Sequence, residues 1–153
     1  MNAHSRRRFL AVLGAIALWP LKIFATAAGT VPSADIKRSN AGVGEDIFIL
    51  RGDEHGYDSL SLIMTETQPH GGPPLHSHEC EEMHILESGT VAYIVGEDHF
   101  TLTAPYVQRI PAKVPHAFMN AGDAVIRLHC VFPSSHYTFK YIAPNPLQIA
   151  APK

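Results

Sequence analysis

The chain has 153 residues, enough for one domain with a hydrophobic core, and its twelve prolines and eleven glycines argue against long helices. Its 14 acidic side chains outnumber its 12 basic ones. Four of the basic side chains lie within residues 1–27, so the rest of the chain has 8 basic and 14 acidic side chains and a net charge of −6. An acidic chain repels the phosphate backbone, so nucleic acid is not an expected partner.

The first 27 residues have the pattern of an export signal. A basic segment at Arg6–Arg8 precedes an uncharged run over residues 9–21, and Ala-Thr-Ala at 25–27 has the small residues of a cleavage site. The run is shorter than the roughly 20 residues of a membrane span, although an uncleaved membrane anchor or a buried helix stays the alternative. The stretch Ser5–Leu10 resembles the twin-arginine motif, which is read by an export receptor. The resemblance implies interaction with the twin-arginine export machinery, cleavage near Ala27 and a periplasmic location.

The remaining chain is predicted to be all-β after a linker at residues 28–44, which are rich in small and polar residues and show no clear period. Short apolar or alternating segments bounded by Gly and Pro predict the strands, and in residues 57–67 the alternation places Leu60, Leu62 and Met64 on one face. Turns spaced by about 8–12 residues are typical of a sandwich, jelly roll or barrel. We expect one domain over residues 45–142 and an extended tail over 143–153. The expected strands are 47–50, 57–67, 83–87, 90–95, 99–103, 107–110, 117–120, 124–132 and 136–142.

Two segments carry the residue types of a metal site. His76 and His78 share one face of an extended strand, because strand side chains alternate, and Glu82 follows after a bend. His116 begins a later strand, just after a Pro-rich turn. Three imidazoles and a carboxylate suit a divalent transition metal and leave coordination positions open for catalysis. Isolated loop histidines and solvated acidic residues are the alternative interpretation of this pattern.

The spacing of these residues resembles the two motifs of the cupin family. The first motif spans His76-x-His78, Glu82 and Gly89, and the second spans Pro111 to Asn120 with His116. The resemblance covers roughly residues 45–140 and implies a single cupin jelly-roll barrel. It assigns His76, His78, Glu82 and His116 as ligands of one metal ion in the barrel mouth.

The chain departs from the family pattern at three turn positions. His70, Pro105 and Lys113 stand where the family usually has glycine. These positions shape turns and do not bind metal, so the fold and the ligands are expected to survive. The path of the turn before His116 is the feature that the departures affect.

Further residues are assigned by their position in the expected strands. His84 has the parity of Glu82, and is either a catalytic or ligand-facing helper or an ordinary buried histidine. Phe118 has the parity of His116 and is expected to line an apolar pocket. Arg127 and His129 share a face of a late strand, and either reach the pocket or form cross-strand polar pairs. The thiols of Cys80 and Cys130 either form a disulfide or stay free and buried.

Two functions fit the pattern. The first is a mononuclear, metal-dependent oxygenase-like enzyme, by resemblance a dioxygenase, that acts on a small organic molecule, with Glu82 either staying a ligand or accepting a proton. The second is a non-catalytic cupin that holds metal or binds a small ligand. Folding in the cytoplasm before export favours iron or manganese, with nickel, zinc and copper as alternatives. The family resemblance and the exposed strand edges predict a homodimer.

Overall fold

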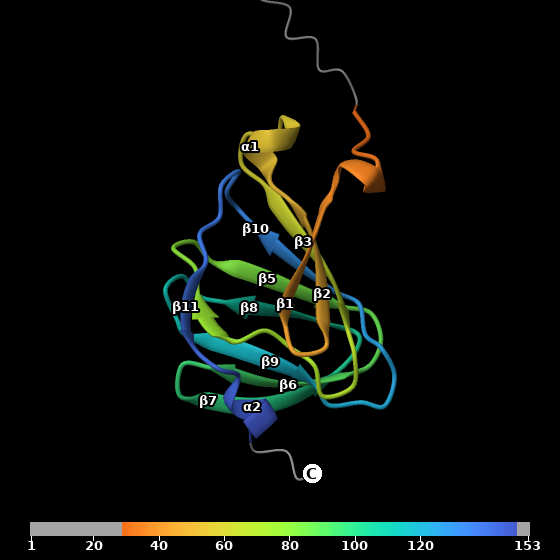
Figure 1. Cartoon of the computed structure of the whole chain (residues 1–153). Coiled ribbons are helices and arrows are strands. Elements are labelled where there is room, and N and C mark those ends of the chain that lie inside the picture. Colours follow the sequence, from red (N-terminus) through yellow and green to blue (C-terminus); the bar gives the residue numbers. More distant parts are fainter. Residues whose placement is uncertain (1–28, 150–153) are drawn as a thin grey trace, which may run out of the picture. The chain divides into compact units, whose positions relative to one another are not determined.

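The computed structural model describes residues 29–149, and its contacts divide the chain between Thr30 and Val31, so that the fold is that of the unit beginning at Val31. The expected export signal lies outside the described residues. Two antiparallel sheets face each other in the described unit. Figure 1 shows β9, β6 and β7 running side by side, with β10, β5 and β3 in the other layer. The arrangement is that of a jelly-roll barrel, as expected from the sequence.

The first sheet contains six strands of the described chain, and the second contains five. In spatial order the first sheet has β1 (Lys37–Gly42), β2 (Glu45–Leu50), β3 (Ser61–Thr67), β10 (Leu128–Phe132), β5 (Glu82–Leu86) and β8 (Tyr106–Ile110). The second has β11 (Lys140–Ala143), β4 (Leu75–Ser77), β9 (His116–Asn120), β6 (Thr90–Val95) and β7 (Asp98–Thr103).

The hydrophobic core lies between the inner faces of the two sheets. It is made of the large apolar side chains that alternate with outward polar residues along the strands, which is the pattern of a sheet with one buried face. Its almost fully buried members are Leu86, Val91, Tyr93, Phe118, Ile126, Leu128 and Phe132.

The segment predicted as a linker is partly structured. Residues Ser33–Asp35 form a 3-10 helix, η1, and Lys37–Gly42 form strand β1, which pairs with β2. Its composition hid this strand, because β1 is an edge strand with no fully buried residue, so its side chains need no apolar period. The linker prediction is therefore wrong for residues 37–42.

The face of β3 that carries the predicted apolar alternation is not the buried one. Leu62 and Met64 are half-buried on the outer face, whereas Ile63, Thr65 and Thr67 are buried. The two threonine hydroxyls lie 3.1 Å apart, and the backbone N–H of Leu128 donates to Thr65 Oγ1 at 3.2 Å. Because their hydrogen bonds are made inside, these hydroxyls can be buried at little cost.

Helices are short in the described residues, as expected. Helix α1 covers Gly52–His55, and residues 57–60, which were expected to open a strand, precede β3 without joining it. Helix α2 covers Pro146–Ile149 in the tail predicted as extended, and lies against β9 and β6. No described helix is long and apolar enough to cross a membrane.

Two of the three turn positions that lack the family's glycine still adopt a left-handed backbone. His70 has a φ of 61° and Lys113 a φ of 65°, values that glycine adopts most easily. The backbone N–H of Lys113 donates to the carbonyl of His78 at 2.7 Å, and that of His70 donates to the carbonyl of Asn120 at 2.9 Å. The turn before His116 is thus retained and is bonded to the segment that carries His78.

Candidate metal centre

The four expected ligands come from neighbouring strand ends of both sheets. His76 lies on β4, His78 lies one residue past the end of β4, and His116 begins β9. His76 and His116 are paired directly across the β4–β9 ladder. Glu82 begins β5 in the facing sheet. All four side chains are buried, and one ligand atom from each lies within 4.8 Å of the others.

Backbone carbonyls fix the orientation of the three imidazoles. Nδ1 of His76 donates to the carbonyl of Pro74 at 2.7 Å, and Nδ1 of His116 donates to the carbonyl of Val114 at 2.9 Å. Nδ1 of His78 donates in the same way to the carbonyl of Thr138. A carbonyl only accepts, so each Nδ1 carries the hydrogen, and a neutral ring then has its lone pair on Nε2. This is how metal-binding histidines are commonly oriented.

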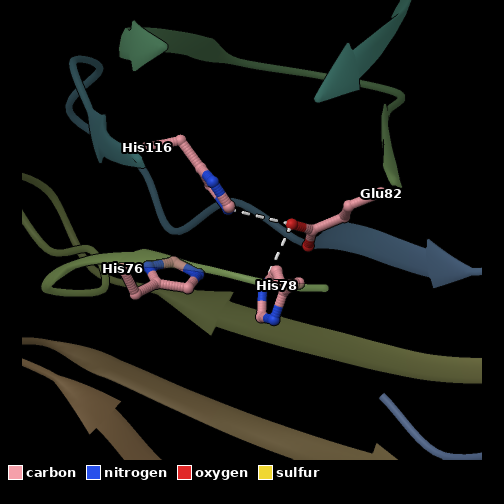
Figure 2. A group of neighbouring side chains, drawn as sticks. All are labelled: His76, His78, Glu82 and His116. Carbon is pink, nitrogen blue, oxygen red and sulfur yellow. Dashed lines mark ion pairs between the residues drawn. The ribbon is translucent and has the colours of Figure 1, made fainter. Parts of the chain in front are cut away.

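The carboxylate of Glu82 meets two of these Nε2 atoms. Oε2 of Glu82 lies 3.0 Å from Nε2 of His116 and 3.4 Å from Nε2 of His78 (Figure 2). Among the described residues, Glu82 Oε2 and His116 Nε2 are buried without a hydrogen-bond partner. Two acceptors that face each other cannot hydrogen-bond, and a cation between them would satisfy both. The geometry and the donor types therefore fit a divalent metal.

The protonation states of the site also suit a metal. Burial, with the neighbouring His116 ring as a smaller cause, lowers the pKa of His76 from 6.5 to about 3, so this imidazole is neutral. Burial opposes ionisation of Glu82, but the His84 ring beside Oε1 is the largest cause that favours its charged form, and the pKa of Glu82 lies well below the usual range. Neutral imidazoles and an ionised carboxylate are the forms that bind metal.

His84 lies behind the carboxylate of Glu82, inside the barrel as its strand parity predicts. Its Nε2 lies 2.9 Å from Oε1 of Glu82, and its Nδ1 lies 3.2 Å from the hydroxyl of Tyr93. The hydroxyl of Tyr93 in turn lies 3.0 Å from that of Tyr106, which is half-buried. This series of side-chain contacts holds the Glu82 carboxylate in place and connects it to β8, the edge strand of the first sheet.

A cavity of about 270 Å³ opens beside the four ligands. Its wall includes the ligands His76, His78 and Glu82, and also His84 and Phe118, as expected for the last two. The other lining side chains are mostly apolar and come from β1, β2, β3 and β10 and from the segments before β4 and β11. They are Asn40, Ala41, Glu45, Ile47, Ile49, Ile63, Thr65, Pro73, Cys130, Tyr137 and Phe139.

Arg127 and His129 do not reach this cavity. Arg127 is exposed and forms an ion pair with Glu66 at 2.9 Å, the cross-strand pairing that was the alternative in the sequence. His129 lies on the outer face of β10. The buried residues of this strand, on its inner face, are Leu128, Cys130 and Phe132. Cys80 and Cys130 are both free thiols, and burial raises the pKa of each.

Sequence reasoning missed Glu45, Tyr137 and Phe139 as cavity residues. Phe139 stacks on the ring of His76, with ring centroids 4.7 Å apart, and Tyr137 stacks on Phe132 at 4.5 Å. The available signal was alternation: Glu45, Ile47 and Ile49 have the same parity, as do Tyr137 and Phe139. For Glu45 that signal was hidden because the expected strand began at residue 47; Tyr137 and Phe139 lie within the expected strand 136–142, but their inward face was not assigned.

Comparisons with known proteins agree with this picture. Residues 63–132 match a family described as "Cupin domain". No curated protein sequence is significantly similar to the chain. Among solved structures, an S161A mutant of Bacillus subtilis oxalate decarboxylase has a TM-score of 0.61 and 19% identity, over 70% of this chain and 29% of that chain.

Two further solved structures differ in how much of their own length matches this chain. The polyketide cyclase RemF from Streptomyces resistomycificus has a TM-score of 0.61 and 19% identity, over 79% of this chain and 89% of that chain. A recombinant oxalate oxidase in complex with glycolate has a TM-score of 0.58 and 17% identity, over 64% of this chain and 55% of that chain. The chain spans only about a third of the oxalate decarboxylases. Residues 63–132 thus match the cupin domain, and the solved structures share the fold of this chain; together these findings support the cupin family for it.

Proposed function

We propose that the chain is a metal-dependent, oxygenase-like enzyme that acts on a small organic molecule. One observation carries the proposal: the lone pairs of His76, His78 and His116 and the carboxylate of Glu82 converge at the wall of a cavity. Bound there, a divalent metal would polarise a coordinated substrate or O₂ and lower the barrier to its reaction. Each of the four residues would supply one ligand atom.

The chain's own residues prepare this site for chemistry. His84 donates from Nε2 to Glu82 Oε1 and so keeps the carboxylate turned toward the three imidazoles. Glu82 is also the group that can accept a proton from a ligand in the cavity. Phe118, Ile63 and Phe139 line the cavity with apolar surface, which excludes water and strengthens electrostatic interactions within it.

The composition of the cavity bears on the choice of substrate. The solved structures of similar fold include oxalate decarboxylase, oxalate oxidase and a polyketide cyclase. No Arg or Lys is among the described residues that line the cavity. A small dianion such as oxalate would therefore lack a positively charged partner other than the metal. The walls favour a compact molecule with an apolar body.

Metal choice, export and assembly extend the proposal. Folding before twin-arginine export would load iron or manganese in the cytoplasm, and the mature protein would act in the periplasm. Exposed edge strands, such as β8 with its exposed Val107, support a homodimer.

The first experiment is elemental analysis of the protein isolated from the periplasm, with His76→Ala and, as a control, His99→Ala. His99 is exposed and lies outside the four-residue cluster. We expect about one iron or manganese per chain in the native protein and the control, and a loss of at least tenfold in His76→Ala. Absence of stoichiometric metal from the native protein would refute the proposed function.

Catalysis is tested separately by O₂ uptake with small phenolic, keto and thiol substrates. The alternative function, a non-catalytic cupin that binds a small ligand, rests on the same cavity. A metal-loaded protein that binds such compounds without O₂ uptake or decarboxylation would favour this second function.

A further inference from the structure

The cavity contains a second carboxyl that the metal site does not use. Glu45 begins strand β2, is 1% exposed and lines the same cavity as the metal ligands. Glu45, Ile47 and Ile49 alternate along β2, so all three face the interior. Glu45 lies outside residues 63–132 and so does not belong to the stretch that matches the cupin domain.

One oxygen of this carboxyl has a partner and the other does not. The hydroxyl of Thr67 donates to Oε1 of Glu45 at 3.3 Å. Oε2 of Glu45 is buried and has no hydrogen-bond partner among the described residues. Native proteins leave few buried polar atoms unpaired, because each one costs free energy.

The charge state of Glu45 follows from its surroundings. Burial, with the Glu82 carboxylate as a smaller cause, raises the pKa of Glu45 from 4.5 to about 8, although the bond from Thr67 opposes the shift. At neutral pH the side chain is therefore a neutral acid. Since Oε1 accepts from Thr67, the hydrogen belongs on Oε2, where it has no acceptor.

The wall of the cavity thus carries polar groups on different strands, the metal ligands and Glu45, together with apolar side chains. The metal ligands lie on β4, β5 and β9, and Glu45 lies on β2, three strands from β5 in the order of the first sheet. Ile47 and Ile49 on β2 and Ile63 on β3 line the same cavity with apolar surface. The last torsion of a glutamate side chain is broad, so the carboxyl can turn toward a ligand in the cavity without a strained rotamer.

We propose that Glu45 is a second anchor for the ligand and donates a hydrogen bond to a carbonyl or carboxyl oxygen remote from the metal-binding group. The ligand class is a compact molecule with an apolar body and an oxygen function at each end. Only the contact at the metal end rests on the proposed function; the contact at Glu45 does not.

Matched probes test the contact in the native protein and three variants. The first pair, 4-acetylbenzoate and 4-isopropylbenzoate, is used with the zinc-loaded protein and differs only in the carbonyl. The second pair, acetophenone and cumene, lacks a carboxylate and is used with metal-free protein. Glu45→Leu removes the donor, Glu45→Gln keeps an N–H donor, and Glu66→Gln is a control, because Glu66 pairs with Arg127 on the outer face.

We expect the acetyl probe of each pair to bind about fivefold to tenfold more tightly than its partner, the effect of one neutral hydrogen bond. The preference should persist in Glu45→Gln and Glu66→Gln and vanish in Glu45→Leu. Glu45→Leu should also unfold at the same or a higher denaturant concentration, whereas loss of a purely structural glutamate would lower it.

Three results would overturn the inference: no preference in the native protein, a preference that survives in Glu45→Leu, or no binding of any of the four probes. These results leave the metal content untouched, so the proposed function would stand. Conversely, failure to bind zinc together with a retained preference for acetophenone would reject the metal site and support the role of Glu45.

Discussion

Replacing Glu45 by Gln should change how the stability of the protein depends on pH. The carboxyl of Glu45 has its pKa raised from 4.5 to about 8 in the folded chain. Between these two pH values the unfolded chain has lost the proton and the folded chain retains it. The contribution of this carboxyl to stability is therefore complete below pH 4.5 and falls as the pH rises toward 8.

The magnitude follows from the width of that interval. At about 1.4 kcal/mol per pH unit, the interval from 4.5 to about 8 corresponds to a loss of up to about 5 kcal/mol. Glutamine does not titrate and is nearly isosteric. The difference in unfolding free energy, Glu45→Gln minus native, should thus rise by about 3 kcal/mol between about pH 5 and pH 7 and level off above about pH 8.

The assay is urea unfolding followed by circular dichroism at several pH values, with a chelator in both samples so that metal release does not contribute. Taking the difference between the two proteins removes the pH dependence that they share, including that of His76. Glu66→Gln, on the outer face, should show no such rise. A difference that stays constant over the whole range from acid to mildly alkaline pH would show that Glu45 ionises normally in the folded chain, and the reasoning would fail.

Three further substitutions test the backbone and the hydrogen-bond chain. Lys113→Gly should raise the unfolding free energy by about 1 kcal/mol, because the left-handed φ of 65° suits glycine; Lys113→Ala should show no such gain in the same urea titration. Gly72→Ala should prevent stable folding, detected by circular dichroism, because its Cβ would lie 2.1 Å from the carbonyl oxygen of Phe118. Tyr93→Phe should cost about 1–2 kcal/mol and leave metal content unchanged, since its hydroxyl has one buried hydrogen-bond contact, with His84, and one part-buried contact, with Tyr106. Tyr57→Phe at an exposed position should cost nothing measurable.

The sequence was sufficient to predict the architecture and the cluster of four candidate ligands. Alternating apolar residues between Gly and Pro signals predicted the all-β fold, which the structure confirms. The spacing of His76, His78, Glu82 and His116 predicted a cluster, and the four residues do meet in space. Their binding of a metal and the catalytic role of His84 stay predictions.

The remaining features could not be predicted because they depend on contacts between distant segments. The inward face of β3 is partly polar, and only the bond from Leu128 N–H to the Thr65 hydroxyl shows why burial is tolerated there. Strand β1 exists because β2 pairs with it, not because of its own composition. Glu45 was missed for a similar reason: a carboxylate at the start of a strand is ordinarily exposed, and its burial depends on β3 and on the opposite wall.

The cavity joins two parts of the chain, one inside and one outside the stretch that matches the cupin domain. The ligands at 76–116 lie within the matched cupin stretch, whereas Glu45, Ile47, Ile49, Tyr137 and Phe139 lie outside it. Substitutions in β2 or before β11 would alter which molecule is accommodated without disturbing the residues that hold the ion. Two chains with the same matched stretch would then have the same four expected metal ligands and accept different organic molecules. In such a protein, selectivity could diverge through the flanking strands while the ion-binding stretch stays unchanged.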